Sequence, residues 1–107
     1  MPETRIDDLL AKLRHGLEHL YGDRLQSTYL FGSFARGEAT PESDVDILIV
    51  LDEVHDYGQE IKRTSHLISE ISLDYDLSIS RVFVSTSAWQ HRDSPFLSSL
   101  RKQAIAA

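Results

Sequence analysis

Hydrophobic residues recur near the start of the chain at steps of three and four, which is the spacing of one helical face. The residues on this stripe are Ile6, Leu9, Leu10, Leu13, Leu17 and Leu20. The pattern predicts a helix over residues 4–21, with Thr4 as its cap and Gly22 at its end. A second stripe predicts another helix over residues 56–72. Its members are Tyr57, Ile61, Thr64, Leu67, Ile68 and Ile71.

Three segments have the composition of strands. Residues 26–31 end at Gly32, and residues 75–85 alternate and are rich in β-branched side chains. The strongest strand is Val45–Leu51, whose continuous apolar run predicts burial on both faces at the centre of a sheet. A short helical turn over residues 33–36 is expected directly after the first strand.

A last helix is predicted from Ser94 onward. Ser94 is its expected N-cap, Pro95 lies in its first turn, and Arg101 and Lys102 lie near its C-terminal end. The residues expected on its inner face are Phe96, Leu97, Leu100 and Ala104. The order of elements predicts a small mixed β-sheet flanked by helices, in the α/β or α+β class. Residues 1–107 are expected to form one domain.

Charge and composition narrow the classes of function. Eleven Lys and Arg against seventeen Asp and Glu give a net charge of −6, which argues against broad nucleic-acid binding but leaves room for a single nucleotide. The absence of cysteine excludes disulfides, cysteine zinc sites and thiol nucleophiles. The longest apolar run, Ile47–Leu51, is too short to span a membrane, and no signal peptide is recognisable at the N-terminus, so a cytoplasmic location is expected.

The residues that indicate chemistry lie between the first two strands. Gly32 allows a close approach of the backbone to a ligand, and the hydroxyl of Ser33 is placed to hold phosphate oxygens. Asp44 and Asp46 are two residues apart, so their side chains leave the same face of a strand. Two adjacent carboxylates repel each other, and an oxygen-only donor set favours Mg²⁺ or Mn²⁺. The arrangement indicates nucleotidyl or phosphoryl transfer.

This segment resembles the signature of the polymerase-β-type nucleotidyltransferases, and most closely the minimal nucleotidyltransferase (MNT) branch. The pattern reads Gly-Ser-x-Ala-Arg-Gly, five residues, Ser-Asp-x-Asp, three residues and Val. The matching residues are Gly32, Ser33, Ala35, Arg36, Gly37, Ser43, Asp44, Asp46 and Val50. The resemblance also covers the order of elements and implies the palm-like nucleotidyltransferase fold.

The resemblance implies that ATP is the substrate and that its phosphates bind near Gly32 and Ser33. Arg36 and Ser43 belong to the same implied nucleotide site. The acceptor hydroxyl attacks the α-phosphorus and pyrophosphate leaves.

The resemblance further implies that Asp44 and Asp46 bind two Mg²⁺ ions, for which Mn²⁺ can substitute. A third carboxylate is expected on the next strand. Asp76 is the first candidate for this third catalytic and metal-binding position, and Asp74 is its substitute.

The resemblance also implies a partner. Chains of this kind are antitoxins that transfer AMP to a tyrosine of a HEPN-domain toxin encoded by a neighbouring gene. The alternative is a catalytically weak antitoxin that neutralises its partner by binding alone. Transfer to a small hydroxyl compound ranks lower, because the chain offers no room for an acceptor domain.

Two further signals allow more than one interpretation. Arg36 is placed either to contact phosphate or to pair with Glu38 or Glu42. His15 and His19 match a zinc-protease pattern, but they lie opposite the leucine stripe of their helix and are expected to face solvent.

Overall fold

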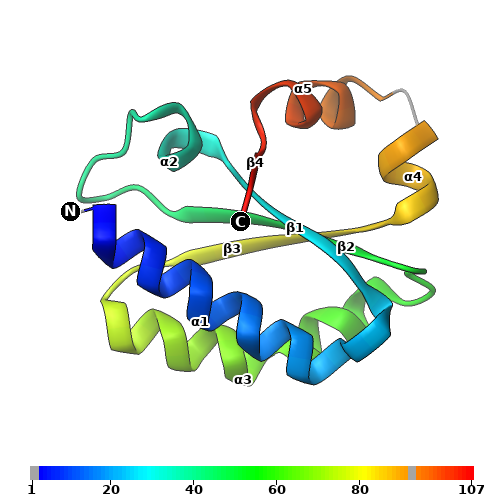
Figure 1. Cartoon of the computed structure of the whole chain (residues 1–107), viewed down its shortest axis with the longest axis horizontal. Helices are drawn as coiled ribbons and strands as arrows, with labels where there is room; N and C mark the ends of the chain where they lie inside the picture. The colour runs from blue at the N-terminus through cyan, green and yellow to red at the C-terminus, as the bar shows by residue number, and fades with distance from the viewer. Residues whose placement is uncertain (1–2, 92–93) are drawn as a thin grey trace.

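The computed structural model describes residues 3–91 and 94–107, which form a four-stranded sheet covered by helices on both faces (Figure 1). The strands are β1 (Leu25–Phe31), β2 (Val45–Leu51), β3 (Ile79–Ser85) and β4 (Ile105–Ala106). Their order in the sheet is β3-β2-β1-β4. β1 pairs antiparallel with β2 and β4, whereas β2 and β3 are parallel. The predicted mixed sheet is therefore confirmed.

The helices form two layers. The long helices α1 (Glu3–Tyr21) and α3 (Tyr57–Tyr75) cover one face of the sheet, as Figure 1 shows. The other face carries α4 (Thr86–His91) and α5 (Pro95–Gln103). Two short helices, η1 (Gly22–Arg24) and α2 (Gly32–Arg36), lie on either side of β1 in the chain. In the described part of the chain, no helix has the length and apolar character needed to cross a membrane.

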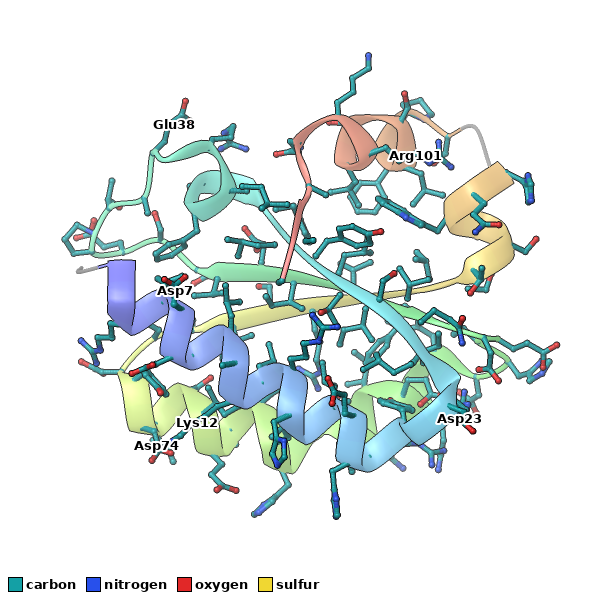
Figure 2. All side chains as sticks on the ribbon, in the orientation of Figure 1. Asp7, Lys12, Asp23, Glu38, Asp74 and Arg101 are labelled. Carbon is teal, nitrogen blue, oxygen red and sulfur yellow. The ribbon has the colours of Figure 1, made fainter. Side chains whose placement is uncertain are left out.

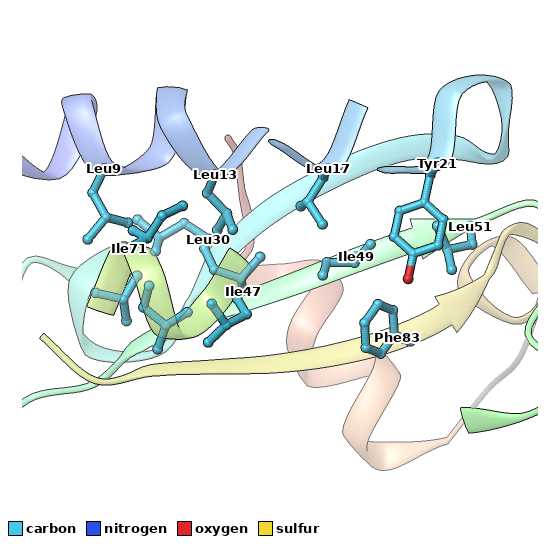
Figure 3. Close-up of a cluster of buried hydrophobic side chains, with 13 residues drawn as sticks. Leu9, Leu13, Leu17, Tyr21, Leu30, Ile47, Ile49, Leu51, Ile71 and Phe83 are labelled. Atoms are coloured by element: carbon cyan, nitrogen blue, oxygen red, sulfur yellow. The ribbon is translucent and has the colours of Figure 1, made fainter. Parts of the chain in front are cut away.

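The central strand is β2, as its apolar run predicts. Alternate residues of β2 join two separate clusters of buried side chains. Ile47, Ile49 and Leu51 face α1 and α3, where Figure 3 shows them packed beneath the leucines of α1. Leu48 and Val50 face α5 and pack with Leu97 and Leu100. Burial on both faces fixes the position of the polar residues at the two ends of this strand.

Helix α1 packs closely on α3. Its stripe of Leu9, Leu13 and Leu17 is buried as predicted, but Leu20 is 40% exposed. A Cβ atom on Gly16 would lie 2.4 Å from Cδ1 of Leu67 on α3, so the glycine permits the close packing of the two helices.

The cap predicted for this helix is wrong, because α1 begins at Glu3 and Thr4 lies inside it. Its predicted end is confirmed: α1 ends at Tyr21, and Gly22 follows with a φ of +56°.

The third strand begins later than predicted. Helix α3 continues to Tyr75, because the apolar stripe of Ile68 and Ile71 extends to that residue. Asp76 ends the helix in the left-handed conformation, with φ 53° and ψ 47°, which Asp tolerates better than most residues. The backbone N–H groups of Asp76 and Leu77 both donate to the carbonyl of Ser72. The alternating pattern from Tyr75 therefore includes a helix end, and β3 starts only at Ile79.

Three elements were not predicted. Helix η1 has three residues, α4 has six and β4 has two, and all are too short to show a periodic pattern. The predicted inner face of α5 is correct for Leu97 and Leu100, but Phe96 is 54% exposed and Ala104 follows the end of the helix.

Candidate functional site

The two motif aspartates lie at the start of the central strand. Asp44 directly precedes β2 and is exposed, whereas Asp46 is the second residue of the strand and is half-buried. Asp46 pairs with Phe31 of β1 on one side and with Ser80 of β3 on the other. It belongs to the sheet face that carries α5, because its neighbour along this face, Leu48, packs against that helix.

The backbone of Gly32 lies directly against the carboxylate of Asp46. Gly32 follows Phe31, the residue opposite Asp46, and has a φ of +74°. A Cβ atom at this position would lie 2.1 Å from Oδ2 of Asp46, closer than any real contact. The glycine is therefore required for both its conformation and the close approach. The turn and the carboxylate, which the sequence places 14 residues apart, form one surface.

The negative charge of Asp46 is only partly neutralised by its surroundings. Burial raises the pKa of Asp46 above its ordinary value, and the negative charge of Asp44 raises it further. The positive charge of Arg36 acts in the opposite direction but does not cancel the effect. The influence of Asp44 on Asp46 indicates that the two carboxylates lie near each other, as their spacing predicts.

Ser43 is engaged within its own loop. Its hydroxyl accepts a hydrogen bond from the backbone N–H of Thr40 at 2.8 Å, and its own N–H donates to the carbonyl of Thr40 at 3.0 Å. These bonds close a turn around Pro41 immediately before Asp44. The structure thus gives Ser43 a role in shaping the loop, and its contact with a nucleotide remains a prediction.

Arg36 is held by two side chains. Its Nε lies 3.0 Å from Oε2 of Glu38, which is one of the two acidic partners that the sequence suggests. Its Nη1 donates to Oε1 of Gln103, on α5, at 3.0 Å. Nothing in the sequence points to Gln103, because this contact depends on α5 folding back over the sheet toward α2.

The third carboxylate does not lie where it is expected. Strand β3 contains no acidic residue, and Ser80 occupies the position beside Asp46. Asp76 is exposed at the end of α3, so its predicted place on a strand is wrong. Asp74 lies within α3, with Oδ2 4.0 Å from Nζ of Lys12 on α1. Figure 2 shows Asp74 on the α3 side of the sheet and Glu38 on the α2 side.

Asp76 does line a large cavity. This cavity has a volume of about 550 Å³ and lies between the N-terminal end of α1, the C-terminal end of α3 and the loop after α2. Its walls include Arg5, Phe34, Gly37, Thr40, Tyr75 and Asp76. Arg5 donates from Nη2 to the carbonyl of Tyr75, which holds this wall together. Asp76 therefore faces a space beside the loop that leads to Asp44.

The donor set fits magnesium in part. Mg²⁺ in phosphate-transfer sites is held by one or two carboxylates, with phosphate and water oxygens as the other ligands. Asp44 and Asp46 provide such a pair, and a cation would offset both the burial of Asp46 and the charge of Asp44, which together raise the pKa of Asp46. Among the residues that the structure describes, no group of three or more His, Asp or Glu side chains is arranged to hold an ion.

Comparison with known proteins decides the family. The model of the nucleotidyltransferase domain matches residues 10–96, which include the whole motif. The chain belongs to this family of nucleotidyltransferases. Two proteins of Methanocaldococcus jannaschii that are named protein adenylyltransferases are similar in sequence. MJ0141 is 34% identical over 77 residues, covering 72% of this chain and 77% of MJ0141. MJ0604 is 38% identical over 71 residues, covering 66% of this chain and 65% of MJ0604.

Solved structures share the fold of this nucleotidyltransferase. A toxin–antitoxin structure with AMP-PNP aligns with a TM-score of 0.61 and 20% identity, covering 99% of this chain and 72% of that chain. A nucleotidyltransferase from Sulfolobus solfataricus aligns with a TM-score of 0.58 and 18% identity, covering 99% of this chain and 87% of that chain. The nucleotidyltransferase fold implied by the motif is therefore confirmed.

Proposed function

We propose that this nucleotidyltransferase transfers AMP from ATP to a tyrosine hydroxyl of a partner protein, a HEPN-domain toxin encoded by a neighbouring gene. In this proposal residues 1–107 act as one minimal nucleotidyltransferase domain, and the transfer makes the chain the antitoxin of a toxin–antitoxin pair. The reaction depends on Mg²⁺, for which Mn²⁺ can substitute.

One observation carries the proposal: the backbone of Gly32 lies against the carboxylate of Asp46, with Asp44 beside it. A phosphate chain needs a surface without side chains that it can approach, together with a cation to neutralise its charge. The glycine turn supplies the first, and the carboxylate pair supplies ligands for the second. The two features have no common structural purpose, because adjacent carboxylates at a half-buried strand end destabilise the free protein.

The chemistry is a substitution at the α-phosphorus of ATP. The acceptor oxygen forms a bond to the α-phosphorus, the bond from the α-phosphorus to the bridging oxygen breaks, and pyrophosphate leaves. Bound magnesium supplies positive charge against the charge that develops on the phosphate oxygens. Gly32 and Ser33 position the phosphates, and Asp76 is the candidate acceptor for the tyrosine proton, since it faces the large cavity and Asp74 is turned toward Lys12.

The comparisons support this choice of acceptor and partner. The Methanocaldococcus relatives are named protein adenylyltransferases, which act on proteins and transfer AMP. One of the solved structures with the same fold is a toxin–antitoxin structure with AMP-PNP, an ATP analogue. A protein acceptor also agrees with the exposure of Asp44 and Asp76 on the surface of the molecule.

A second candidate function is neutralisation of the partner by binding alone. The observation that favours it is the third carboxylate: β3 carries none, and no three-ligand group is present in the part of the chain that the structure describes. A pure binding protein has no need of that carboxylate. The two functions differ in whether the partner is covalently modified.

The test is incubation of the purified chain with Mg-ATP and the protein encoded by the adjacent gene, followed by intact-mass analysis. We expect the partner to gain mass in units of AMP. Replacing both metal-site residues, Asp44→Ala with Asp46→Ala, should reduce the initial rate at least about 1,000-fold, because charge stabilisation by bound metal is worth several kcal/mol.

Glu42→Ala is the matched control, since Glu42 is an exposed acid two residues before Asp44 in the same loop. This variant should keep the wild-type rate. An unmodified partner in a tight complex that forms without ATP would instead establish the binding function, and an unmodified partner without a complex would exclude both.

A further inference from the structure

A glutamine at the end of α5 joins this helix to the motif. Oε1 of Gln103 accepts a hydrogen bond from Nη1 of Arg36 at 3.0 Å, across 67 residues of sequence. The other end of the same amide, Nε2, donates to Oγ of Ser99 at 3.3 Å, one turn earlier in α5. The bond to Ser99 turns the carbonyl oxygen of Gln103 toward Arg36. Gln103 lies outside the part of the chain that the family model matches.

Helix α5, which carries Gln103, is held in place by its cap and by its buried leucines. Ser94 caps its first turn by accepting a hydrogen bond from the N–H of Leu97 at 3.1 Å. Leu97 and Leu100 are buried against Leu48 and Val50 of the central strand. After Gln103 and one further residue, Ala104, the chain enters β4, which pairs with β1. Gln103 is therefore fixed from both sides along the chain, by packed leucines before it and by strand pairing after it.

Arg36 retains donors for a ligand. A guanidinium has five N–H groups. Among the described residues its hydrogen bonds use one at Nε, to Glu38, and one at Nη1, to Gln103, so 5 − 2 = 3 remain. Arg36 is the last residue of α2, the short helix that begins at Gly32 and Ser33, where the phosphates are proposed to bind. Arginine donors in a fixed plane suit the paired oxygens of phosphate groups.

We infer that Gln103 is a positioning residue of the nucleotide site, which holds the guanidinium of Arg36 in place for the triphosphate of ATP. The inference rests on the proposed nucleotide site and extends it to α5. An arginine held by two partners before the ligand arrives loses less side-chain entropy on binding. Without Gln103, the one bond that Arg36 keeps among the described residues is to the exposed Glu38, which is a weak restraint.

The test measures the affinity for Mg-ATP by titration calorimetry, together with thermal unfolding. Gln103→Met removes the acceptor while keeping the length of the side chain. We expect the Kd for Mg-ATP to rise about 3- to 10-fold, the effect of one hydrogen bond of about 1 kcal/mol. Gln90→Met is the matched control, because Gln90 is an exposed glutamine on the adjacent helix α4, and it should leave the Kd unchanged.

Comparison with Arg36→Met separates positioning from general stability. If Gln103 acts through Arg36, adding Gln103→Met to Arg36→Met should raise the Kd no further. Ser99→Ala, which frees the amide of Gln103, should raise the Kd less than Gln103→Met does. In steady-state transfer assays, Gln103→Met should raise the KM for ATP and leave kcat within about 2-fold, since the interaction is with bound nucleotide.

The outcomes that overturn the inference are distinct from failure of the proposed function. An unchanged Kd in Gln103→Met, or an equal increase in the presence and absence of Arg36, contradicts positioning. A loss of affinity that follows the fall in melting temperature assigns Gln103 a structural role only. A chain that binds Mg-ATP but modifies no partner refutes the proposed transfer, and the binding measurements on Gln103 still decide this inference.

Discussion

Two carboxylates in opposite electrostatic situations lie near the two ends of the central strand, Glu60 of α3 at one end and Asp46 of β2 at the other. Glu60, near the C-terminal end of β2, is almost completely buried and accepts hydrogen bonds from the hydroxyl of Tyr21 at 2.8 Å and from Arg24 and Arg63 at 3.2 Å each. Asp46, at the N-terminal end, is half-buried beside another carboxylate. Burial opposes the charge of both, but Tyr21 and Arg24 hold the pKa of Glu60 below its ordinary value, whereas that of Asp46 is raised.

The difference indicates what each end of the strand does. The Glu60 network joins the end of α1, η1 and α3, so its charge is used to hold the fold together. The Asp46 end keeps a repulsion that the fold itself does not relieve, as expected of a site that an added cation completes. Six residues of extended strand, or about 20 Å, separate the two ends, so their effects on stability and on nucleotide binding are expected to be independent.

The largest effect on stability is expected from removing the charge of Glu60. Glu60→Gln should lower the free energy of unfolding by about 2–3 kcal/mol, because it weakens three hydrogen bonds to a buried charge and removes the charge that pairs with Arg63 and, beside Asp52, with Arg24. The affinity for Mg-ATP should stay within about 2-fold of wild type. Urea unfolding at pH 7 and calorimetric titration measure the two quantities.

Glu70→Gln is the control for that change, since Glu70 is an exposed glutamate on the same helix. It should alter stability by less than about 0.5 kcal/mol. A large loss of nucleotide affinity in Glu60→Gln at a temperature where the variant is folded would contradict the separation of the two ends.

Gly32→Ala tests the other end of the strand. It places a side chain in the left-handed region and against Asp46, so we expect a loss of about 2 kcal/mol of stability and at least about a 10-fold rise in the Kd for Mg-ATP. Gly37 offers a matched control, because its φ of +73° is almost the same but a Cβ there would meet nothing within 4 Å.

Gly37→Ala should therefore show the conformational cost without the loss of nucleotide affinity. The difference between the two alanine variants isolates the contact with Asp46. If both variants bind Mg-ATP equally well, the close approach of Gly32 to Asp46 has no part in nucleotide binding.

The sequence predicts this glycine–aspartate pair well because the information is local. The apolar run of β2 can form only a central strand, and Gly32 can be recognised as the end of the preceding strand. Antiparallel pairing of the two strands then brings Gly32 to Asp46, since Phe31 lies opposite that residue. The chemistry and the fold are encoded by the same short segment.

The positions of the third carboxylate and of Gln103 are harder to predict, because each depends on how the helices pack in the tertiary structure. The alternation from Tyr75 to Ser85 fits a strand, but the packing of Tyr75 on α1 extends the helix and moves Asp76 to its end. Gln103 has no motif, and its role appears only when α5 packs on β2 and points its last residue at Arg36. The hydrophobic periodicity of the sequence predicts neither of these contacts.

Acid should reduce the stabilising effect of Glu60. A carboxyl whose pKa is lowered in the folded protein contributes stability above its unfolded value of about 4.5, and this contribution is lost as the pH falls through the folded value. The stability difference between wild type and Glu60→Gln should therefore shrink below pH 4.5. Urea unfolding of both proteins at pH 6 and pH 3.5 measures it, and a difference that grows in acid would show that the charge of Glu60 is not stabilising.

The smallest expected effect is a gain in stability at the other end of β2. Asp44→Asn removes the repulsion of Asp46, so the free energy of unfolding should rise by about 0.5 kcal/mol in EDTA without nucleotide. The gain should shrink in acid, because the raised pKa of Asp46 means that it takes up a proton in the folded state as the pH falls. The same change should weaken Mg-ATP binding, so that one substitution stabilises the free protein and impairs the complex. A fall in melting temperature in EDTA would instead show that Asp44, like Glu60, stabilises the fold.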